Sequence, residues 1–263
     1  MHYGYSMTEY LNAVDIPDES EFQNDRNHWR KSIANDSQIR SNAVELQIRA
    51  EEHKYTYQHE WMGVPIIRLP DDIVLQQEIV HHLRPSCIIE TGVARGGSLI
   101  LSASLMAINS LQPSVLGLDL LIMPHAKSAI TNCKFANSIS LWEGDSTSAA
   151  ALVEARSFLS KQSPHEPILL VLDSDHSEKH VLNELNTFSN LLPVGSVIMV
   201  ADTIIEEFPT GHFVDRPWDV GNNPLTALKK FLQSDSRFVS VEKWNRRSLL
   251  SEFRDGILVK VAN

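Results

Sequence analysis

Carboxylate and imidazole side chains gather at the ends of two apolar runs in the second half of the chain. The first run, ILLVLD, ends in Asp173, and the second, GSVIMVAD, ends in Asp202. If these runs are adjacent parallel strands, their ends lie about 5 Å apart, and both carboxylates can hold one hard divalent cation. Such an ion would lower the pKa of a substrate hydroxyl. His176, in the turn after Asp173, would remove the proton, because an imidazole titrates near neutral pH.

A glycine-rich turn follows an earlier apolar run, in the sequence IIETGVARGGSLIL. Glycines let the backbone turn sharply and approach a ligand closely. A dinucleotide fingerprint would need glycine where Ala94 stands, so that motif fails. Glu90 stands just before the turn, and a carboxylate there suits a cationic ligand better than a pyrophosphate. S-adenosylmethionine, which carries a sulfonium and an amino group, fits this requirement.

Two further acidic residues end the next apolar runs along the chain. Asp119 is the fifth residue of the run VLGLDL and can accept both hydrogen bonds of a ribose diol. Asp145 and Ser146 follow the run SISLW and can contact an adenine. A simpler alternative is that Asp145 caps the next helix. The glycine turn, Asp119, and the pair Asp145 and Ser146 all follow successive predicted strands. Open α/β sheets bind ligands at such strand ends, and this favours the cofactor site.

The elements that must position these residues alternate between short apolar runs and helical stretches. Five strands buried on both faces alternate with helices, which predicts a mostly parallel sheet with helices on both faces. The runs RFVSVEK and GILVKV add an antiparallel pair at the edge and bring the sheet to seven strands. Helices are expected after Pro70 and over residues 97–110, 146–161, 178–192 and 224–234.

Two segments lie outside this alternation. Residues 1–60 are expected to form an N-terminal extension or oligomerisation arm, with a helix over 37–56, and residues 61–263 the cofactor-binding domain. Residues 203–223 form a long loop before the last helix. A loop of that length inside a compact domain is usually functional, so we expect a lid, with Trp218 and Asn222 near its closing end.

The acidic stretch LDSDHSEKHV also allows two alternatives. Its two aspartates can be helix caps, with His180 paired to Glu184 on a solvated helix surface. Alternatively, His176 and Glu178 have the spacing of a non-haem iron facial triad, which His212 would complete. The α/β pattern argues against that triad, because its usual carrier is an all-β barrel.

Composition excludes several other classes. The net charge of −10 argues against nucleic acid as a partner, since binding phosphate backbones needs clustered Lys and Arg. Cys87 and Cys133 are too few for a disulfide framework or a cysteine zinc site, which favours a reducing, cytoplasmic location. No signal-peptide pattern is present, and no apolar stretch approaches the roughly 18 residues of a transmembrane helix.

With these residues in place, the chain resembles the cephalosporin hydroxylase family over about residues 57–261. The resemblance rests on EWMGVPIIRLPDDIVLQQEIV, IIETGVARGGSLIL, LDSDHSEKHVLNEL, GSVIMVADT and RPWDVGNNPLTALKKFL, in this order. It implies a Rossmann-like class I methyltransferase fold, related to sugar and catechol-type O-methyltransferases. It also implies a set of site residues: Glu90, Gly92, Arg95, Gly96 and Ser98 at the methionine end of S-adenosylmethionine, Asp119 at its ribose, Asp145 and Ser146 at its adenine, Asp173 beside the cofactor and on Mg²⁺, Asp202 also on Mg²⁺, and Asp175 as a third metal ligand or a base.

The chain departs from the family pattern at the fifth strand, where relatives carry an acidic pair and this chain has Ala201 before Asp202. Losing a carboxylate weakens a hard-cation site unless water, Asp175 or Glu206 substitutes. His176 occupies the offset at which catechol-type enzymes carry a lysine. The expected function is O-methyl transfer to a hydroxyl of a small molecule, sugar or glycolipid by a homo-oligomer. An iron-type hydroxylase and a non-catalytic accessory component are the alternatives.

Overall fold

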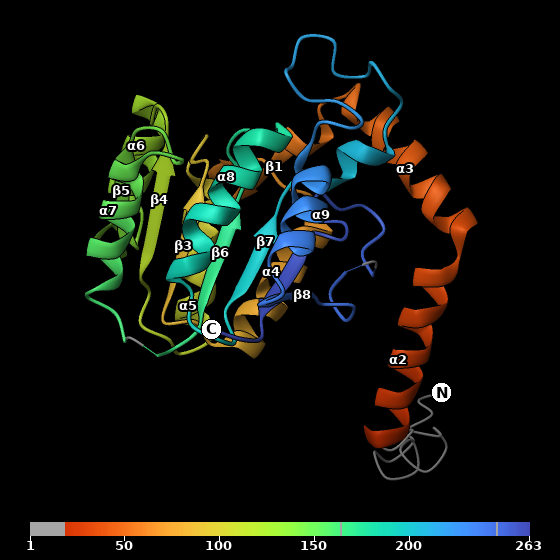
Figure 1. Cartoon of the computed structure of the whole chain (residues 1–263), viewed down its shortest axis with the longest axis horizontal. Coiled ribbons are helices and arrows are strands. Elements are labelled where there is room, and N and C mark those ends of the chain that lie inside the picture. The colour runs from red at the N-terminus through yellow and green to blue at the C-terminus, as the bar shows by residue number, and fades with distance from the viewer. Residues whose placement is uncertain (1–18, 164, 246) are drawn as a thin grey trace, which may run out of the picture.

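The computed structural model describes residues 19–163, 165–245 and 247–263. Its centre is a twisted sheet with the strand order β5-β4-β3-β6-β7-β9-β8 (Figure 1). The first five strands in that order are mutually parallel, and β9 runs antiparallel to both β7 and β8. The strands are β3 (Cys87–Thr91), β4 (Val115–Asp119), β5 (Ile139–Glu143), β6 (Ile168–Leu172), β7 (Val197–Val200), β8 (Phe238–Ser240) and β9 (Ile257–Lys260).

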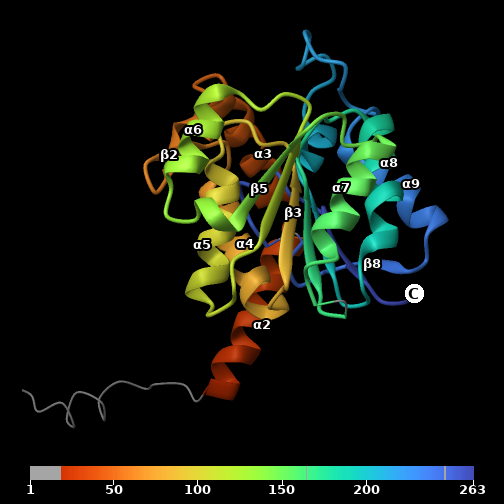
Figure 2. The same cartoon turned by 90° about the vertical axis from the view of Figure 1, so that its left-hand side faces the viewer.

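Helices cover both faces of the sheet, because alternate strand residues point to opposite sides. Ile88 of β3 packs with one group of helices, and Ile89 packs with the other. Figure 2 shows the sheet edge-on between the two groups. One group is α4 (Pro70–Leu83), α5 (Gly97–Ile108) and α6 (Pro124–Asn132); the other is α7 (Ala149–Leu159), α8 (Glu178–Phe188) and α9 (Pro224–Ser234). The predicted α/β fold, with its antiparallel strand pair at the edge, is confirmed.

The strand order creates a crevice at the carboxyl ends of β3 and its neighbours. The chain passes from β3 to β4 on one side, and β6 later pairs with β3 on the other side. At such a switch point the connections diverge to opposite faces and leave a crevice beyond the strand ends. The glycine turn after β3 and the acidic turn after β6 both open into this region.

The N-terminal segment contains more regular structure than the sequence indicated. The predicted helix over 37–56 is α3 (Ser37–Glu51), whose N-cap Asp36 accepts hydrogen bonds from the next turn. Before it stands α2 (Glu19–Asn35), which has no buried residue and projects from the body of the molecule (Figure 1). After α3 come a 3₁₀ turn, η1 (Tyr55–Gln58), and the hairpin β1 (His59–Trp61) and β2 (Val64–Ile66). Residues 1–18 lie outside the described residues.

The expected lid, residues 203–223, begins with the 3₁₀ turn η4 (Thr203–Glu207). The rest lacks regular helix or strand apart from an isolated bridge between Asp219 and Asn222. A shorter 3₁₀ turn, η3 (Ser189–Leu191), follows α8. In the described part of the chain, no helix has the length and apolar character needed to cross a membrane.

Candidate active site

A cavity of about 320 Å³ lies beyond the carboxyl ends of β3, β6 and β7. Its walls come from the glycine turn, the acidic turns after β6 and β7, the lid, and the segment that joins α3 to β2. Of the predicted site residues, the cavity is lined by Gly92, Arg95, Gly96, Ser98, Asp173, His176 and Asp202. The glycine turn and the predicted metal ligands therefore share one space.

Two features fix the glycine turn: the left-handed backbone conformation of Gly92, and hydrogen bonds to the side chain of Asp119. Gly92 has φ +89°, and a Cβ there would lie 1.9 Å from the carbonyl oxygen of Asp173. Only glycine allows this conformation and this contact with the end of β6. The Asp119 carboxylate accepts hydrogen bonds from the backbone N–H of Val93 (2.7 Å) and of Ala94 (3.3 Å). Asp119 thus fixes the turn from outside the cavity lining.

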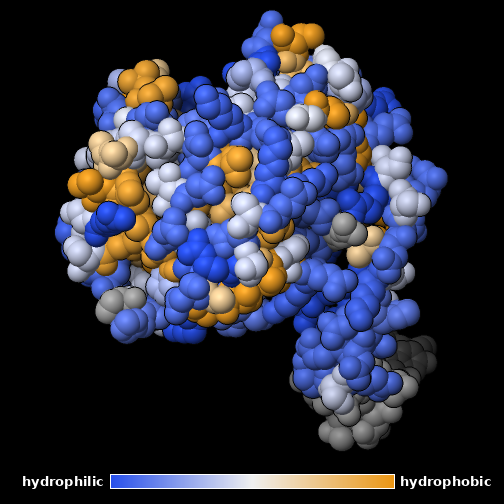
Figure 3. All heavy atoms as spheres, viewed as in Figure 1, coloured by the Kyte–Doolittle hydropathy of each residue, from blue (hydrophilic) through white to orange (hydrophobic). Residues whose placement is uncertain are grey.

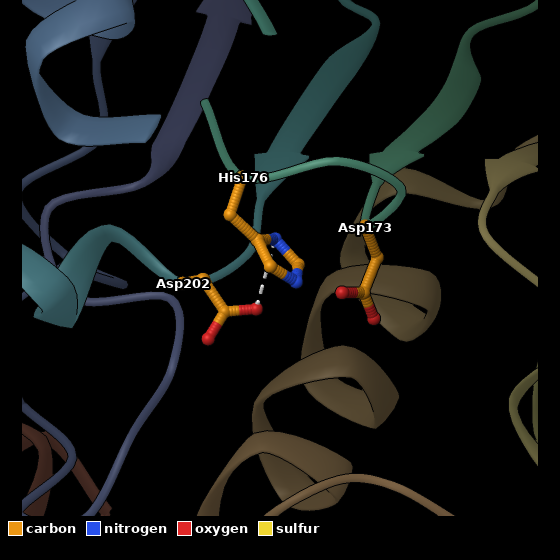
Figure 4. Close-up of side chains that lie close together, drawn as sticks. All are labelled: Asp173, His176 and Asp202. Atoms are coloured by element: carbon orange, nitrogen blue, oxygen red, sulfur yellow. Dashed lines mark ion pairs between the residues drawn. The ribbon is translucent and has the colours of Figure 1, made fainter. Parts of the chain in front are cut away.

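Asp173, His176 and Asp202 form a compact cluster at the cavity wall. One potential ligand atom from each residue lies within 4.8 Å of the others. The imidazole Nδ1 of His176 lies 3.2 Å from the Asp202 carboxylate, and its ring contacts Trp218 edge-on at 4.7 Å between centroids. Figure 4 shows the imidazole between the two carboxylates. This donor set has the composition of a divalent metal site.

Behind the cluster lies a buried ion-pair network that the sequence did not indicate. The fully buried Arg68 places Nη2 3.3 Å from Asp173 and 3.8 Å from Glu90. Glu90 is fully buried and accepts hydrogen bonds from Ser98 and Ser102, so it reaches the cavity only through Ser98. Burial raises the pKa of Asp173 to about 7 against the attraction of Arg68, and the charge of Asp202 raises it further.

Asp145, Ser146 and Asp175 lie outside the cavity lining. Asp145 accepts hydrogen bonds from the backbone and hydroxyl of Thr147, and the N-cap of α7 is Ser148. Asp175 likewise accepts hydrogen bonds from its neighbour Ser177, which is the N-cap of α8. The capping alternative therefore places the helix starts on the wrong residues, because each aspartate closes its own turn and a serine occupies each N-cap position.

Ser146 is tied to helix α8 by a buried carboxylate. Glu184 is fully buried and accepts hydrogen bonds from Ser146 Oγ (2.6 Å) and Ser174 Oγ (2.8 Å). His180 Nε2 lies 3.1 Å from Ser146 Oγ and 3.4 Å from Glu184. The predicted pair of His180 and Glu184 exists, but its carboxylate is inside the protein, where it joins the turns after β5 and β6.

The residues of the alternative iron triad do not come together. Glu178 pairs with Lys230 of helix α9 and donates its backbone N–H to Asn222. His212 packs against Phe208 and Phe213. Neither belongs to the cluster that contains His176.

Several residues that line the cavity were not identified as site residues from the sequence. Gln47, Glu51, Lys54 and Tyr57 also line the cavity, and they belong to the expected N-terminal extension or oligomerisation arm, residues 1–60. Arg216 and Glu252 also line the cavity, from the lid and from the turn before β9. Arg216 lies in the expected lid, whereas no sequence pattern marked Glu252, which only the folded chain brings to the cavity.

Buried carboxyl groups make the stability of the ion-free protein depend on pH. Burial raises the pKa of Asp72 and of Asp173 to about 7, and that of Glu252 well above its usual value. The folded protein therefore binds more protons than the unfolded chain between about pH 4 and pH 7, so its free energy of unfolding falls as pH rises through this window. We predict that the melting temperature decreases from about pH 5 to pH 8, and that Asp72→Asn makes the decrease smaller. An identical pH profile for this variant would contradict the prediction.

Comparison with known proteins identifies the family. A family described as Rhamnosyl O-methyltransferase/CmcI matches residues 53–261. A rhamnosyl O-methyltransferase of Mycobacterium leprae is 32% identical over 171 residues, which cover 62% of this chain and 70% of the relative. One from Mycobacterium tuberculosis is 29% identical over 168 residues, covering 62% and 66%. The match thus spans about two thirds of the relatives' length.

Solved structures share the fold. A CmcI structure with Mg and SAM has a TM-score of 0.56 at 19% identity and covers 78% of each chain. An O-methyltransferase from Bacillus cereus in complex with SAH has a TM-score of 0.50 at 16% identity and covers 97% of this chain and 96% of its own. At these identities the similarity concerns the fold alone.

The family match and the fold agree with the sequence. The solved structures confirm the expected class I methyltransferase fold. The family match and the curated relatives confirm the expected O-methyltransferase activity. The chain belongs to the Rhamnosyl O-methyltransferase/CmcI family.

Proposed function

We propose that this chain transfers the methyl group of S-adenosylmethionine to a hydroxyl of a sugar-containing acceptor, with a divalent cation beside the acceptor. The observation that carries the proposal is the shared cavity. Its wall contains the glycine turn on one side and the cluster of Asp173, His176 and Asp202 on the other. A cofactor and an acceptor oxygen bound there would be neighbours, and holding them together supplies much of the rate gain in such reactions.

In this proposal the cofactor lies along the turns after β3, β4 and β5. Gly92, Arg95, Gly96 and Ser98 face its methionine end from the cavity wall, and the buried Glu90 acts through Ser98. Asp119 holds the glycine turn and accepts hydrogen bonds from the ribose. Asp145 and Ser146, at the end of β5, contact the adenine.

The donor set of Asp173 and Asp202 fits a divalent cation, because carboxylate oxygens are preferred ligands of such ions. When bound, the cation supplies Lewis-acid stabilisation of an acceptor oxygen that has lost its proton. The chain itself excludes water with Trp218 and Phe213 of the lid. Asp175 was expected as a third metal ligand or a base, but its carboxylate accepts hydrogen bonds from Ser177. His176, expected as the base, lies where a metal ligand would also lie.

A sugar acceptor is supported by the relatives' names and by the cavity lining. Two curated relatives are named rhamnosyl O-methyltransferases. The lining includes the aromatic rings of Tyr57, Phe213 and Trp218. Aromatic rings offer flat apolar surfaces for the C–H faces of a sugar, and polar residues around them can bind its hydroxyls.

Calorimetry and a transfer assay test this function together. We expect S-adenosylmethionine to bind saturably to the chelator-treated protein. With a divalent cation added, labelled methyl should pass to a rhamnose-containing glycoside and not to the same aglycone without sugar. Absence of cofactor binding would contradict the proposal, and equal transfer to the sugar-free compound would contradict the acceptor class.

Replacing Glu184 tests the adenine end of the site. Glu184→Ala removes the acceptor that holds Ser146 and Ser174, and hydrogen bonds to a charged group contribute about 1.5–3 kcal/mol each. We expect S-adenosylmethionine affinity to fall at least about tenfold. Glu184→Gln keeps one oxygen acceptor and should recover part of the loss. Unchanged affinity in Glu184→Ala, measured by calorimetry, would show that Ser146 does not contact the cofactor.

The expected homo-oligomer and cytoplasmic location stay predictions. Helix α2 buries no residue, and its aromatic side chains Phe22 and Trp29 are exposed and contact each other at 6.3 Å between centroids. The face of α2 visible in Figure 3 is hydrophilic. A helix without buried contacts is marginal in water, so a second copy is a suitable partner for the aromatic residues. Light scattering of the protein and of Trp29→Ala would test this.

A further inference from the structure

The proposed cation site has one carboxylate fewer than the acidic pair implied by the family resemblance would provide. Strand β7 ends at Val200, and the next two residues are Ala201 and Asp202. Ala201 is 1% exposed and belongs to the hydrophobic core, so its side chain contributes no ligand atom. The turn after β7 therefore supplies one carboxylate, that of Asp202.

Nearby carboxylates do not replace the missing one. Asp175 Oδ1 accepts hydrogen bonds from the backbone and hydroxyl of Ser177. Glu206 Oε2 accepts hydrogen bonds from the backbone of Gly221 (2.8 Å) and the side chain of Asn223 (2.6 Å), which hold the lid. Glu252 lines the cavity but is not part of the compact cluster found among the described residues.

The third potential ligand within reach is a nitrogen. His176 lies in the same 4.8 Å group as Asp173 and Asp202, and its side chain is 20% exposed. Its Nδ1 lies 3.2 Å from the Asp202 carboxylate, and the ring lies between two carboxylates (Figure 4). Ligand atoms that lie about 2.1 Å from one ion are about 3 Å apart, which is close to the separation of Nδ1 and the Asp202 oxygen. The edge contact with Trp218 holds the ring in this position.

We propose that His176 is a metal ligand and that the site takes a first-row divalent transition-metal ion, with Mn²⁺ as the representative, in preference to Mg²⁺. This inference rests on the proposed function and specifies its cation. Mg²⁺ is bound by oxygen ligands and water, whereas imidazole is a good ligand for transition-metal ions. A ligand set of two carboxylates and one imidazole therefore fits a transition-metal ion better than Mg²⁺.

A ligand role for His176 differs from the base role expected from the sequence. With Nδ1 on the ion, the neutral imidazole carries its proton on Nε2 and has no lone pair left to take the acceptor's proton. A base role and a ligand role thus predict different spectroscopic results for the same residue.

The test is metal binding to chelator-treated protein, followed without any activity measurement. Calorimetry should give an affinity for Mn²⁺ at least about tenfold higher than for Mg²⁺, since an added nitrogen ligand favours the transition metal. Pulsed electron paramagnetic resonance of bound Mn²⁺ should show coupling to a ¹⁴N nucleus. His176→Asp should remove that coupling and bring the two affinities closer. His212→Gln, a nearby histidine outside the cluster, is the matched control and should keep both properties.

A bound Mn²⁺ without nitrogen coupling in the wild type would overturn the proposal, and so would nitrogen coupling that persists in His176→Asp. Failure of this inference is distinguishable from failure of the proposed function. A protein that binds S-adenosylmethionine and methylates a sugar with Mg²⁺ alone, and shows no nitrogen coupling, keeps the function and loses the ligand role of His176. Failure of S-adenosylmethionine binding would instead remove the function itself.

Discussion

Asp173→Asn should lower the methyl-transfer rate by about a thousandfold or more while leaving S-adenosylmethionine affinity within about threefold of the wild type. The carboxylate of Asp173 lies in the cluster with His176 and Asp202, whereas the cofactor is expected mainly along the glycine turn. A metal ion that stabilises charge on an acceptor oxygen contributes several kcal/mol, and each 1.36 kcal/mol is about a factor of ten in rate. Single-turnover transfer and calorimetry measure the two effects separately.

The electrostatic surroundings of Asp173 give this experiment an internal control. Burial and Asp202 raise the pKa of Asp173, so its charge is unfavourable to the ion-free fold at high pH. The neutral asparagine should therefore keep or increase the melting temperature at about pH 8. Asp235→Asn, which removes a surface ion pair with Arg237, should leave the transfer rate unchanged. An equal loss of cofactor affinity and rate in Asp173→Asn would contradict the separation of the two subsites.

The central sheet could be predicted from the sequence because its inner strands β3, β4, β6 and β7 are buried on both faces. Each run from Cys87 to Leu172 is short and followed by a helical stretch, a pattern that few folds other than a parallel sheet produce. The strand ends then follow directly, and so does the meeting of Asp173 with Asp202, because their strands are neighbours. The apolar runs in the sequence thus predicted the site residues that lie at the ends of neighbouring strands.

The buried polar network could not be predicted in this way. Glu90 ends an apolar strand, but the sequence does not say whether its carboxylate faces a ligand or the protein interior. Its partner Arg68 lies just after a three-residue strand that is too short for a periodicity to appear. A buried arginine is stable only because several acidic residues surround it, and those residues come from distant parts of the chain.

The regular structure of the N-terminal segment, and its contribution to the cavity wall, were not predicted for a related reason. Helix α2 has no buried face, so its sequence lacks the apolar period by which helices are recognised. Lys54 and Tyr57 line the cavity only because α3 and the β1–β2 hairpin pack beside the glycine turn. That packing is close: a Cβ on Gly97 would lie 2.4 Å from the carbonyl oxygen of Pro65. The boundary expected at residue 60 therefore cuts through one wall of the cavity.

Gly92→Ala should destabilise the protein by about 2–5 kcal/mol and abolish detectable cofactor binding. The first part of the cost is conformational, because a left-handed backbone costs a residue with a Cβ about 1–2 kcal/mol. The second part is steric, because the new Cβ would lie 1.9 Å from the carbonyl oxygen of Asp173, and overpacking costs about 1–3 kcal/mol. Urea unfolding measures the loss of stability, and calorimetry measures the loss of binding.

Gly195→Ala separates the two costs, because Gly195 has the same φ of +89° but a Cβ there would meet no atom within 4 Å. It should lose only the conformational part, about 1–2 kcal/mol, and keep cofactor affinity. In Gly92→Ala the clash must move either the glycine turn or the end of β6, and the two elements carry the two halves of the proposed site. Both the cofactor contacts and the position of Asp173 should therefore change together in this one variant. Equal destabilisation of the two variants with cofactor binding retained in both would show that contact between the turn and β6 does not organise the site.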